Sequence, residues 1–480
     1  MRFLSMLAAA GALAVLAGCV PTAPFRTTWN AAATPSPPAD CEARPSQPGS
    51  ALAQLPNHET TQAYDLYFVE FDEQGLLYPR GRPEVGIASC HIEALMRDLD
   101  ALAKSGSGLS IVVYVHGWKH NAADTDDNVA TFRQLLLDAA LVEQAKQQDF
   151  GLAPHRVVGI YVSWRGKSLV LPEPFLSLTF WDRKATAQHI AEGESRVLFA
   201  RLRGFYELQN QLNPPVQGEK KVLLILLGHS FGGLILLEAV SQSLITSLFE
   251  YDATPGQEHV IPRYGDMIVL ANPAVEALRY TPLHRAAAAQ RYARYQTPIF
   301  VSITSTADWA TGAAFPIGRS VDALFETSLS DEESDGNKKT MGHMDPYITH
   351  ELTMRSDGVA TCPGWKPVDP GAPSESQERT NLMLERANSK AFFGQEPGSL
   401  TLAPGWRRNF CGDTTLHQLK TDPNSPIWNV TTDGAIIPGH NEITQPVFVS
   451  FVRQLYHDTV IYPVIVERTK SEQASPTGRR

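Results

Sequence analysis

The chain has 480 residues, of which 43% are hydrophobic and 19% are charged. This composition is typical of a globular protein with a sizeable core, either one large α/β domain with insertions or two to three ordinary domains. There are 41 Lys and Arg against 51 Asp and Glu, a formal net charge of −10, and the body has no dense basic block. Because phosphate binding needs clustered Lys and Arg, we do not expect nucleic acid as a partner.

The first residues are typical of an export signal. A positively charged start is followed by a short apolar segment, residues 4–17, which is too short and too rich in alanine for a comfortable transmembrane span. The sequence "LAGC" at residues 16–19 resembles the lipobox of bacterial lipoproteins. The resemblance implies that residues 1–18 are a signal peptide, that Cys19 is lipidated, and that the mature protein is anchored to a membrane outside the cytoplasm.

The residue after the lipidated cysteine bears on which membrane this is. Val20 stands there instead of the aspartate that tends to signal inner-membrane retention. The resemblance therefore implies an outer-membrane lipoprotein that faces the periplasm, if the source is Gram-negative. Ordinary secretion with an incidental Cys19 is the alternative interpretation.

A segment rich in Pro, Ala, Ser and Thr, residues 19–57, is predicted to be a tether that lifts the folded body off the membrane. The four remaining cysteines of an exported chain indicate two disulfides, and three pairings are possible. The simplest prediction pairs near neighbours, Cys41 with Cys90 and Cys362 with Cys411. Neither a C-x-x-C nor an H-E-x-x-H spacing occurs, so no metal or other cofactor is expected.

Short apolar segments alternate with longer helical ones along most of the chain. The segments predicted as strands are residues 64–72, 109–118, 155–164, 221–227, 265–274 and 297–308. The segments predicted as helices are residues 124–147, 183–212 and 234–244, and a final helix that begins near Pro446. Strands and helices that alternate in this way predict an α/β protein, with a mostly parallel sheet covered by helices on both faces.

The alternation lapses between residues 310 and 427. This stretch contains an acidic polar patch, segments rich in Gly and Pro, and two of the cysteines. We therefore predict a large insertion at about 310–427, before the last strand, within one domain that spans residues 58–465. Residues 466–480 are predicted to be a polar C-terminal tail.

The segment "KVLLILLGHSFGGLILLEAV" places Ser230 between glycines, with an apolar strand before it and an apolar helix after it. A serine hydroxyl is a poor nucleophile unless a nearby base accepts its proton. A nucleophile on a sharp strand-to-helix turn has an unfavourable backbone conformation, and Gly228 and Gly232 would let the strand and helix approach closely enough to tolerate it. We predict that Ser230 is such a nucleophile; the alternative is a glycine-rich turn between two core elements.

Four motifs together resemble the α/β-hydrolase family: "VYVHGW", "GHSFGG", "SITSTADWA" and "IPGHNEI". The resemblance covers most of residues 64–455, apart from the insertion. In that fold the nucleophile, the acid and the histidine follow successive strands in this order. The resemblance therefore implies a catalytic triad of Ser230, Asp308 and His440.

The same resemblance implies an oxyanion hole. The turn "HGW", residues 116–118, ends a strand as the corresponding turn of the family does. The backbone N–H groups of Trp118 and Phe231 are thereby implied as the two donors. For the side chains of His116 and His229 we expect only a turn role and a packing role.

Other residues could supply the acid or the base. Glu276 follows the preceding strand, at the other place where this fold can supply an acid, and Asp433 is close to His440 in sequence. His343 and His350 lie in the insertion and could reach the site, although neither follows a final strand. We expect Asp308 to be the acid and Glu276 to be the main alternative.

These residues predict a serine hydrolase that cleaves carboxylic esters through an acyl-enzyme, with a small-molecule or lipid ester as the substrate. A lipase, thioesterase, amidase or peptidase on the same triad is the alternative within this class. From a different class, the chain could be a non-catalytic surface lipoprotein that uses a hydrolase fold for binding. A binding protein has no need of the set Ser230, Asp308 and His440, which argues against that alternative.

Overall fold

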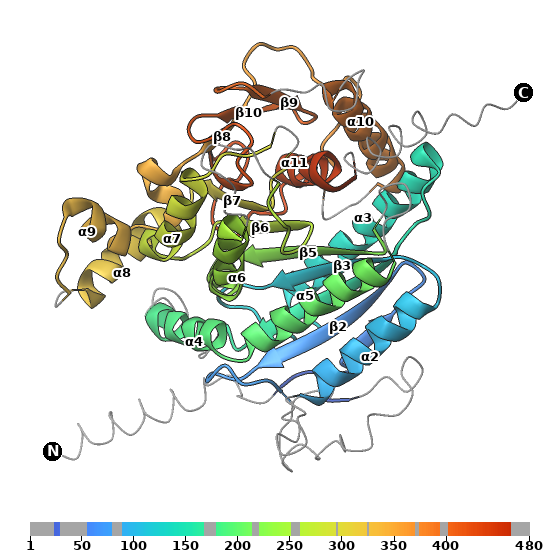
Figure 1. The fold of residues 1–480 in the computed structure, drawn as a ribbon, viewed down its shortest axis with the longest axis horizontal. Helices are drawn as coiled ribbons and strands as arrows, with labels where there is room; N and C mark the ends of the chain where they lie inside the picture. The colour runs from blue at the N-terminus through green and yellow to red at the C-terminus, as the bar shows by residue number, and fades with distance from the viewer. Residues whose placement is uncertain are drawn as a thin grey trace, which may run out of the picture.

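A mixed sheet of eleven strands runs through the part of the protein that the structure, a computed structural model, describes (Figure 1). The described residues are 24–28, 55–78, 89–167, 179–213, 220–250, 260–293, 296–323, 326–369, 374–393 and 402–461. In their order across the sheet, the strands are β1 (His58–Thr60), β2 (Tyr64–Phe71), β4 (Arg156–Trp164), β3 (Leu109–Val115), β5 (Val222–His229), β6 (Met267–Ala271), β7 (Phe300–Ser305), β11 (Ile427–Thr432), β8 (His350–Met354), β10 (Thr414–Gln418) and β9 (Arg407–Phe410).

The strands from β2 to β8 in this order are all parallel, and β1, β10 and β9 add antiparallel strands at the two sides. Every residue of β2 and β3 is buried, as expected of parallel strands that are covered on both faces. Five of the six segments predicted as strands contain one, the sixth (221–227) overlaps β5, which continues to His229, and the predicted α/β class with a mostly parallel sheet is confirmed. The carboxyl ends of the parallel strands therefore share one edge, which we call the carboxyl edge.

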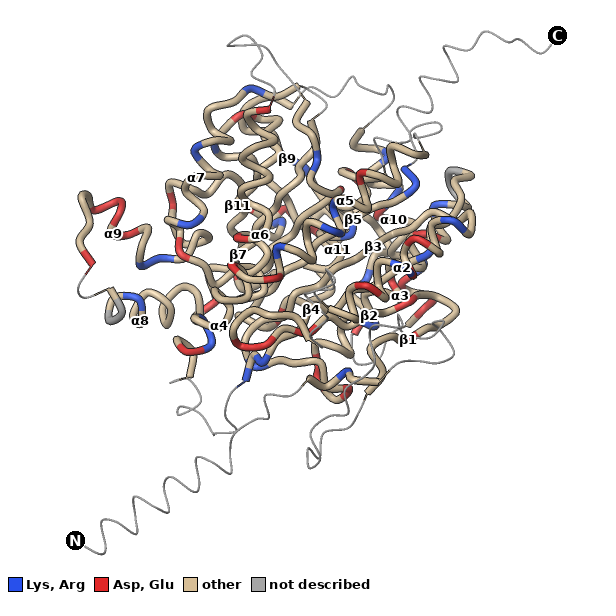
Figure 2. Tube along the Cα trace, turned by 60° about the horizontal axis from the view of Figure 1, so that its bottom comes forward, with Lys and Arg blue, Asp and Glu red and all other residues tan. Residues whose placement is uncertain are grey.

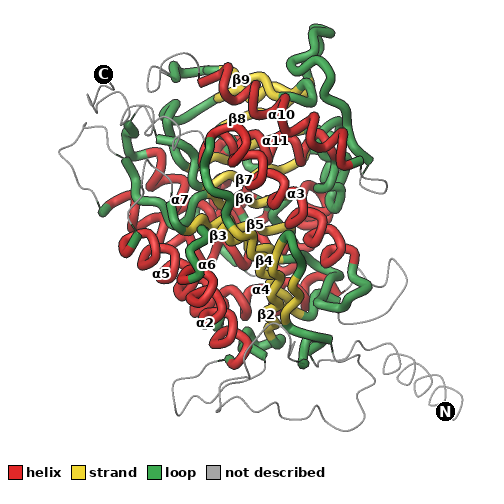
Figure 3. The backbone as a smooth tube through the Cα atoms, turned by 90° about the vertical axis from the view of Figure 1, so that its right-hand side faces the viewer, coloured by secondary structure: helices red, strands yellow, loops and turns green. Residues whose placement is uncertain are grey.

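Helices pack on both faces of the sheet (Figure 3). One face is covered by α2 (Cys90–Lys104), α4 (Phe180–Glu192), α5 (Ser195–Leu212), α6 (Phe231–Phe249) and α7 (Ala277–Ala288). The other face is covered by α3 (Asp127–Phe150) and α11 (Pro446–Tyr456), with α10 (Glu375–Phe393) packed against α11. Among the described helices, α6 has the length and apolar composition to cross a membrane, but most of it is buried between β5, α4 and α7. That is the environment of a core helix.

The segment 183–212, predicted as one long helix, forms two, and that prediction is wrong in this respect. The break between α4 and α5 falls at Gly193 and Glu194, which pack against the turn around Gly75. The N–H of Glu194 donates to the carbonyl of Gly75, and a Cβ on Gly193 would lie 2.6 Å from the same oxygen. The close approach of two backbones far apart in sequence explains the break.

The segment 310–427 has two different roles. Its first part forms η3 (Ala310–Ala314), α8 (Phe315–Asp322) and α9 (Asp331–Lys338), and the last two project beyond the carboxyl edge in Figure 1. Acidic residues of α9 stand out at the margin of the molecule in Figure 2. The second part extends the sheet, since β8 pairs with β11 and is followed by β10 and β9. Half of the predicted insertion is therefore a continuation of the central sheet.

One of the two predicted disulfides has both cysteines within the described residues. Cys362 and Cys411 are bonded across the sheet extension, which confirms their pairing. Cys90, at the start of α2, is also disulfide-bonded. Its predicted partner, Cys41, lies outside the described residues.

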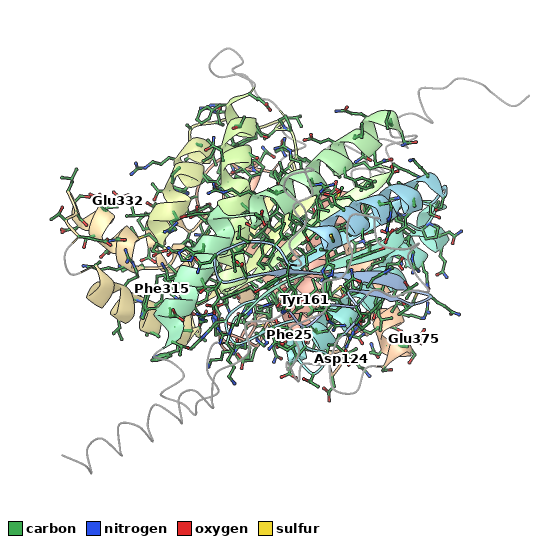
Figure 4. The ribbon with its side chains drawn as sticks, turned by 90° about the horizontal axis from the view of Figure 1, so that it is seen from below. Phe25, Asp124, Tyr161, Phe315, Glu332 and Glu375 are labelled. Atoms are coloured by element: carbon green, nitrogen blue, oxygen red, sulfur yellow. A yellow bond between two sulfur atoms is a disulfide. The ribbon has the colours of Figure 1, made fainter. Side chains whose placement is uncertain are left out.

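Residues 24–28, part of the predicted tether, pack against the folded body as what we call the N-terminal strap (Figure 4, Phe25). The backbone of Thr28 pairs with residues 55–57, and the N–H groups of Phe25 and Arg26 donate to the carboxylate of Glu70 in β2. The Arg26 side chain is 1% exposed and stacks on Phe68. This part of residues 19–57 therefore belongs to the folded body, because a buried arginine and its partners fix it there. The predicted signal peptide 1–18, Cys19 and the predicted tail 466–480 lie outside the described residues.

Candidate active site

Ser230 lies on a sharp turn between β5 and α6, at the carboxyl edge of the sheet. Its backbone has φ 56° and ψ −122°, a conformation that non-glycine residues rarely adopt. The turn needs glycine beside it, since a Cβ on Gly232 would lie 2.0 Å from the carbonyl oxygen of Val115. The N–H of Ser230 donates to the carbonyl of Ala271, which ties the turn to the neighbouring strand β6. The strained strand-to-helix turn predicted from the glycines is present.

The structure brings Ser230, His440 and Asp308 together in one chain of hydrogen bonds. His440 Nε2 lies 2.7 Å from Ser230 Oγ, and His440 Nδ1 lies 2.7 Å from Asp308 Oδ2. Asp308 follows β7, and His440 lies in the loop between β11 and α11. Ser230 and Asp308 are buried, whereas 17% of the His440 side chain is exposed. This is the geometry in which a histidine can take a proton from a serine hydroxyl while a carboxylate orients the ring.

The environment of Asp308 keeps its carboxylate ionised. Burial alone would raise the pKa of Asp308, but hydrogen bonds from His440 and Thr311 outweigh burial and leave this pKa below its ordinary value. Thr311 donates its hydroxyl to Oδ2 at 2.5 Å, and the N–H groups of Ala310 and Thr311 donate to Oδ1. An ionised Asp308 favours the tautomer of His440 with the proton on Nδ1, which leaves Nε2 free to accept the proton of Ser230.

Glu276, the alternative acid, has different neighbours. It precedes α7 as its N-cap and forms ion pairs with Lys184 at 2.6 Å and with Arg279 and Arg319 at 3.3 Å each. Its side chain is 5% exposed, so these cations compensate a buried negative charge. The structure therefore assigns Glu276 to an ion-pair network between α4, α7 and α8 rather than to His440.

The remaining alternatives also have partners of their own. The carboxylate of Asp433 accepts from the N–H of Ala435 in a local turn. His350 lies in β8 against Trp428, and the ring of His343 lies close to Gly312 and within hydrogen-bond distance of Thr340. In the contacts described, His440 alone of the candidate histidines bonds to Ser230.

The turn His116-Gly117-Trp118 lies directly against Ser230, as the predicted oxyanion hole requires. A Cβ on Gly117 would lie 2.7 Å from the Cβ of Ser230, so only glycine fits there. Phe231 is the first residue of α6, where backbone N–H groups point out of the helix and favour a developing negative charge. The N–H groups of Trp118 and Phe231 therefore belong to the two segments that flank the Ser230 side chain.

The His116 ring fixes this turn. It is fully buried and neutral, since burial and the neighbouring His120 lower the pKa of His116 to about 4. Its Nε2 accepts the N–H of Trp164, so its Nδ1 carries the proton and donates to the carbonyl of Gly117. These hydrogen bonds hold the turn in place, as expected for the side chain of His116.

Two residues position His440 that the sequence analysis did not assign to the site. His229 was expected only to pack, yet its Nε2 donates to the carbonyl of His440 at 2.8 Å. Burial is the main cause that lowers the pKa of His229 to about 3, so the ring is neutral. The amide of Asn272 donates to the carbonyls of Gly439 and His440 at 3.1 Å each, and its Oδ1 accepts the N–H of Ser305.

A signal for Asn272 was available in the sequence. It directly follows the strand β6, between the strands that carry Ser230 and Asp308, so it had to lie at the same edge. Its φ of 44° is also of the kind that Asn tolerates better than most residues.

Aromatic rings pack beside the two segments that carry Trp118 and Phe231. The Phe180 ring lies 5.3 Å from Trp118 and 4.8 Å from Phe231, measured between ring centroids. Phe180 and Trp181 both contact Phe315 of α8. Phe231 and Phe315 are fully buried, so these rings form a packed apolar cluster beside the predicted oxyanion hole.

A cavity of about 230 Å³ lies at the same edge, under the N-terminal strap. Phe25, Glu70, Trp164 and Arg165 are among its lining residues, and none of the three residues Ser230, His440 and Asp308 lines it. Within the described ranges, no group of three or more His, Cys, Asp and Glu side chains could hold a metal ion.

We compared the chain with known protein families, proteins and structures. No protein-family model, no curated protein and no solved structure matches the chain. What the site can do is thus argued from its geometry.

Proposed function

We propose that the protein is a serine hydrolase of the α/β-hydrolase class that cleaves carboxylic esters. One observation carries the proposal: the hydrogen-bond chain from Ser230 through His440 to Asp308, with 2.7 Å at each step, on a strained turn at the carboxyl edge of a parallel sheet. A strained serine with an aligned base and a buried carboxylate is costly to maintain, which argues for catalysis over binding alone.

The reaction follows from the positions of the atoms. Ser230 Oγ attacks the acyl carbonyl carbon while His440 Nε2 takes its proton, and the carbonyl oxygen becomes an oxyanion that accepts from the N–H groups of Trp118 and Phe231. Each such donor is worth about 3–4 kcal/mol of barrier. His440 then protonates the departing alkoxide, which leaves an acyl-enzyme. Water hydrolyses this ester by the same route, and Asp308 stabilises the charged form of His440 throughout.

A panel of chromogenic esters and amides tests the reaction class on the purified protein. We expect turnover of esters, and a loss of about 10⁴-fold or more in kcat/KM for Ser230→Ala. Ser247→Ala is the matched control, because Ser247 is a buried serine farther along the same helix α6, and it should retain activity. Turnover of amides alone would overturn the ester proposal, and an inactive wild type would favour a binding protein.

We further propose that the protein is exported and anchored to a membrane by a lipidated Cys19, and that in a Gram-negative source this is the outer membrane, facing the periplasm. The "LAGC" motif at residues 16–19 supports this, and so does the disulfide Cys362–Cys411, since disulfides persist in oxidising compartments. In a Gram-negative host, Cys19→Ser should move the protein from the membrane fraction to the soluble fraction. Retention of this variant in the outer membrane would contradict the anchor.

A further inference from the structure

The N-terminal strap attaches the start of the described chain to the carboxyl edge, where Ser230 lies. Phe25 and Arg26 donate their N–H groups at 3.0 and 2.8 Å to Glu70, the penultimate residue of β2. Arg26 Nε donates at 2.8 Å to the carbonyl of Ala122, in the loop that follows β3. Because β2, β3 and β5 are parallel, their last residues and the strap share one edge of the sheet.

This attachment leaves little chain between the body and the lipid anchor. Pro24, where the strap begins, is five residues after Cys19. A fully extended chain of that length spans at most about 18 Å. A lipidated Cys19 would therefore keep the carboxyl edge close to the lipid surface, instead of lifting the body away on a tether of residues 19–57.

A second and independent observation concerns exposed apolar side chains at the same edge. Trp309, which directly follows Asp308, is 71% exposed, and Ile317 on α8 is 65% exposed. Figure 1 shows α8 projecting on the side toward which the arrowheads of β2 and β3 point. Beneath them, Phe315 of the same helix contacts the rings of Phe180 and Trp181. Packed apolar rings thus connect α8, which carries the exposed Ile317, with Phe231 beside Ser230.

The N-terminal strap and Trp309 lie on opposite sides of Ser230, the candidate nucleophile. The strap binds β2, and Trp309 follows β7. These two strands are five positions apart in the strand order, and β5, which leads to Ser230, lies between them. Five strand spacings amount to about 24 Å. A flat surface that touches the strap region and Trp309 would therefore face the Ser230 turn.

We propose that the carboxyl edge rests on the lipid surface that anchors Cys19, and that the substrate of Ser230 is an ester of a lipid in that surface. This inference rests on the proposed function and deepens it. Asp331, Glu332 and Glu333 open the helix α9, which packs on α8. Their negative charge would be repelled by anionic headgroups, so the proposed surface is zwitterionic.

The orientation can be tested without catalysis. The lipidated Ser230→Ala protein is reconstituted in phosphatidylcholine vesicles with brominated acyl chains, which quench tryptophan fluorescence at short range. We expect Trp309→Phe in this background to remove a measurable part of the quenching. Trp365→Phe is the control, because the Trp365 indole bonds Glu385 of α10, and Glu375 of that helix lies across the molecule from Phe315 in Figure 4. Quenching that does not depend on Trp309 would overturn the orientation.

The substrate class has its own measurement: the ratio of hydrolysis of a long-chain ester in phosphatidylcholine vesicles to that of a monomeric short-chain ester. Ile317→Ser should lower this ratio about tenfold, the effect of one apolar side chain that no longer enters lipid. Leu212→Ser should leave it unchanged, because Leu212 is 66% exposed at the end of α5, beside the start of β5 at the opposite edge.

The outcomes separate the two proposals. A ratio that Ile317→Ser leaves unchanged, with both esters hydrolysed, would overturn the lipid substrate and leave the serine hydrolase intact. No hydrolysis of either ester would instead contradict the proposed function, while the quenching experiment would still decide the orientation.

Discussion

Asp308 and Glu276 are both buried carboxylates, but their neighbours differ. Removing the charge of Asp308 should therefore reduce activity, whereas removing that of Glu276 should reduce stability. Asp308→Asn should lower kcat about 10⁴-fold, because the amide no longer favours the tautomer of His440 that accepts the serine proton. Glu276→Gln should keep kcat and lower the free energy of unfolding by about 3–5 kcal/mol, since Lys184 loses its buried partner. Steady-state kinetics and urea unfolding of both variants measure this. A folded Glu276→Gln protein without activity would contradict the assignment of the acid.

His229 gives a second prediction at this scale. His229→Leu removes the donor to the His440 carbonyl, and a loop displacement of about 1 Å costs up to about 10²-fold in rate. We expect a lower kcat with little change in KM. His229→Gln should recover most of the rate, because the Gln Nε2 can donate to the same carbonyl. If both variants lose the same activity, or if their unfolding free energy falls in proportion, His229 is a packing residue only.

The contacts of His229 and Asn272 with the His440 loop could not be predicted from the sequence, whereas the three residues Ser230, Asp308 and His440 could. The resemblance to the α/β-hydrolase family implied the order Ser230, Asp308, His440, and the structure brings these residues into contact. The roles of His229 and Asn272 depend on backbone carbonyls of residues 439 and 440. The positions of those carbonyls are set by the pairing of β7 with β11, which no local pattern contains.

The turn between β5 and α6 has the tightest packing requirement among the elements of the site. Gly232→Ala should lower the free energy of unfolding by about 1–3 kcal/mol and abolish ester hydrolysis, because its Cβ would overlap the Val115 carbonyl and displace the turn. Gly204→Ala is the matched control. No atom lies within 4 Å of its Cβ position in α5, so this variant should be neutral or more stable by up to about 1 kcal/mol. Equal stability of the two variants, measured by urea unfolding, would contradict the close approach.

At the scale of elements, the sequence predicted those helices and strands whose positions depend on a local pattern of apolar residues. Buried strands such as β3 and β5 are continuous apolar segments, and they were located from composition alone. The break between α4 and α5 was missed because Gly193 contacts the turn at Gly75, more than a hundred residues away. The strap was also not predicted, because Arg26 contacts residues that are distant in sequence, namely Phe68 and Ala122. The composition of residues 19–57 by itself favoured a tether.

The whole molecule carries many neutral histidines in its interior, and this predicts sensitivity to acid. Burial is the main cause that lowers the pKa values of five histidines to about 3 or 4, namely His91, His116, His229, His350 and His457. Below their ordinary pKa of 6.5, the unfolded chain takes up protons that the folded protein cannot. Stability should therefore fall as the pH drops from 6.5 toward 4, by up to about 1.4 kcal/mol per pH unit for each histidine.

Four carboxyl groups have the opposite sign. Burial raises the pKa of Asp138 to about 6 and also raises the pKa values of Glu70, Asp98 and Asp458, so these groups favour the folded state at low pH. The five histidines outnumber these four carboxyl groups, and we expect the urea midpoint to decrease from pH 7 to pH 5. A midpoint that stays constant or increases over this interval would contradict the neutral state of the buried rings.

The central claim is that Ser230 is a nucleophile activated by His440, and a fluorophosphonate probe tests it most directly, because this reagent forms a covalent bond only with an activated serine. The full chain is incubated with the probe and the modified residue is located by mass spectrometry of its peptides. We predict a single adduct on Ser230, which is absent in Ser230→Ala and forms far more slowly in His440→Ala. A folded wild-type protein that remains unlabelled, or an adduct on another residue, would contradict the account.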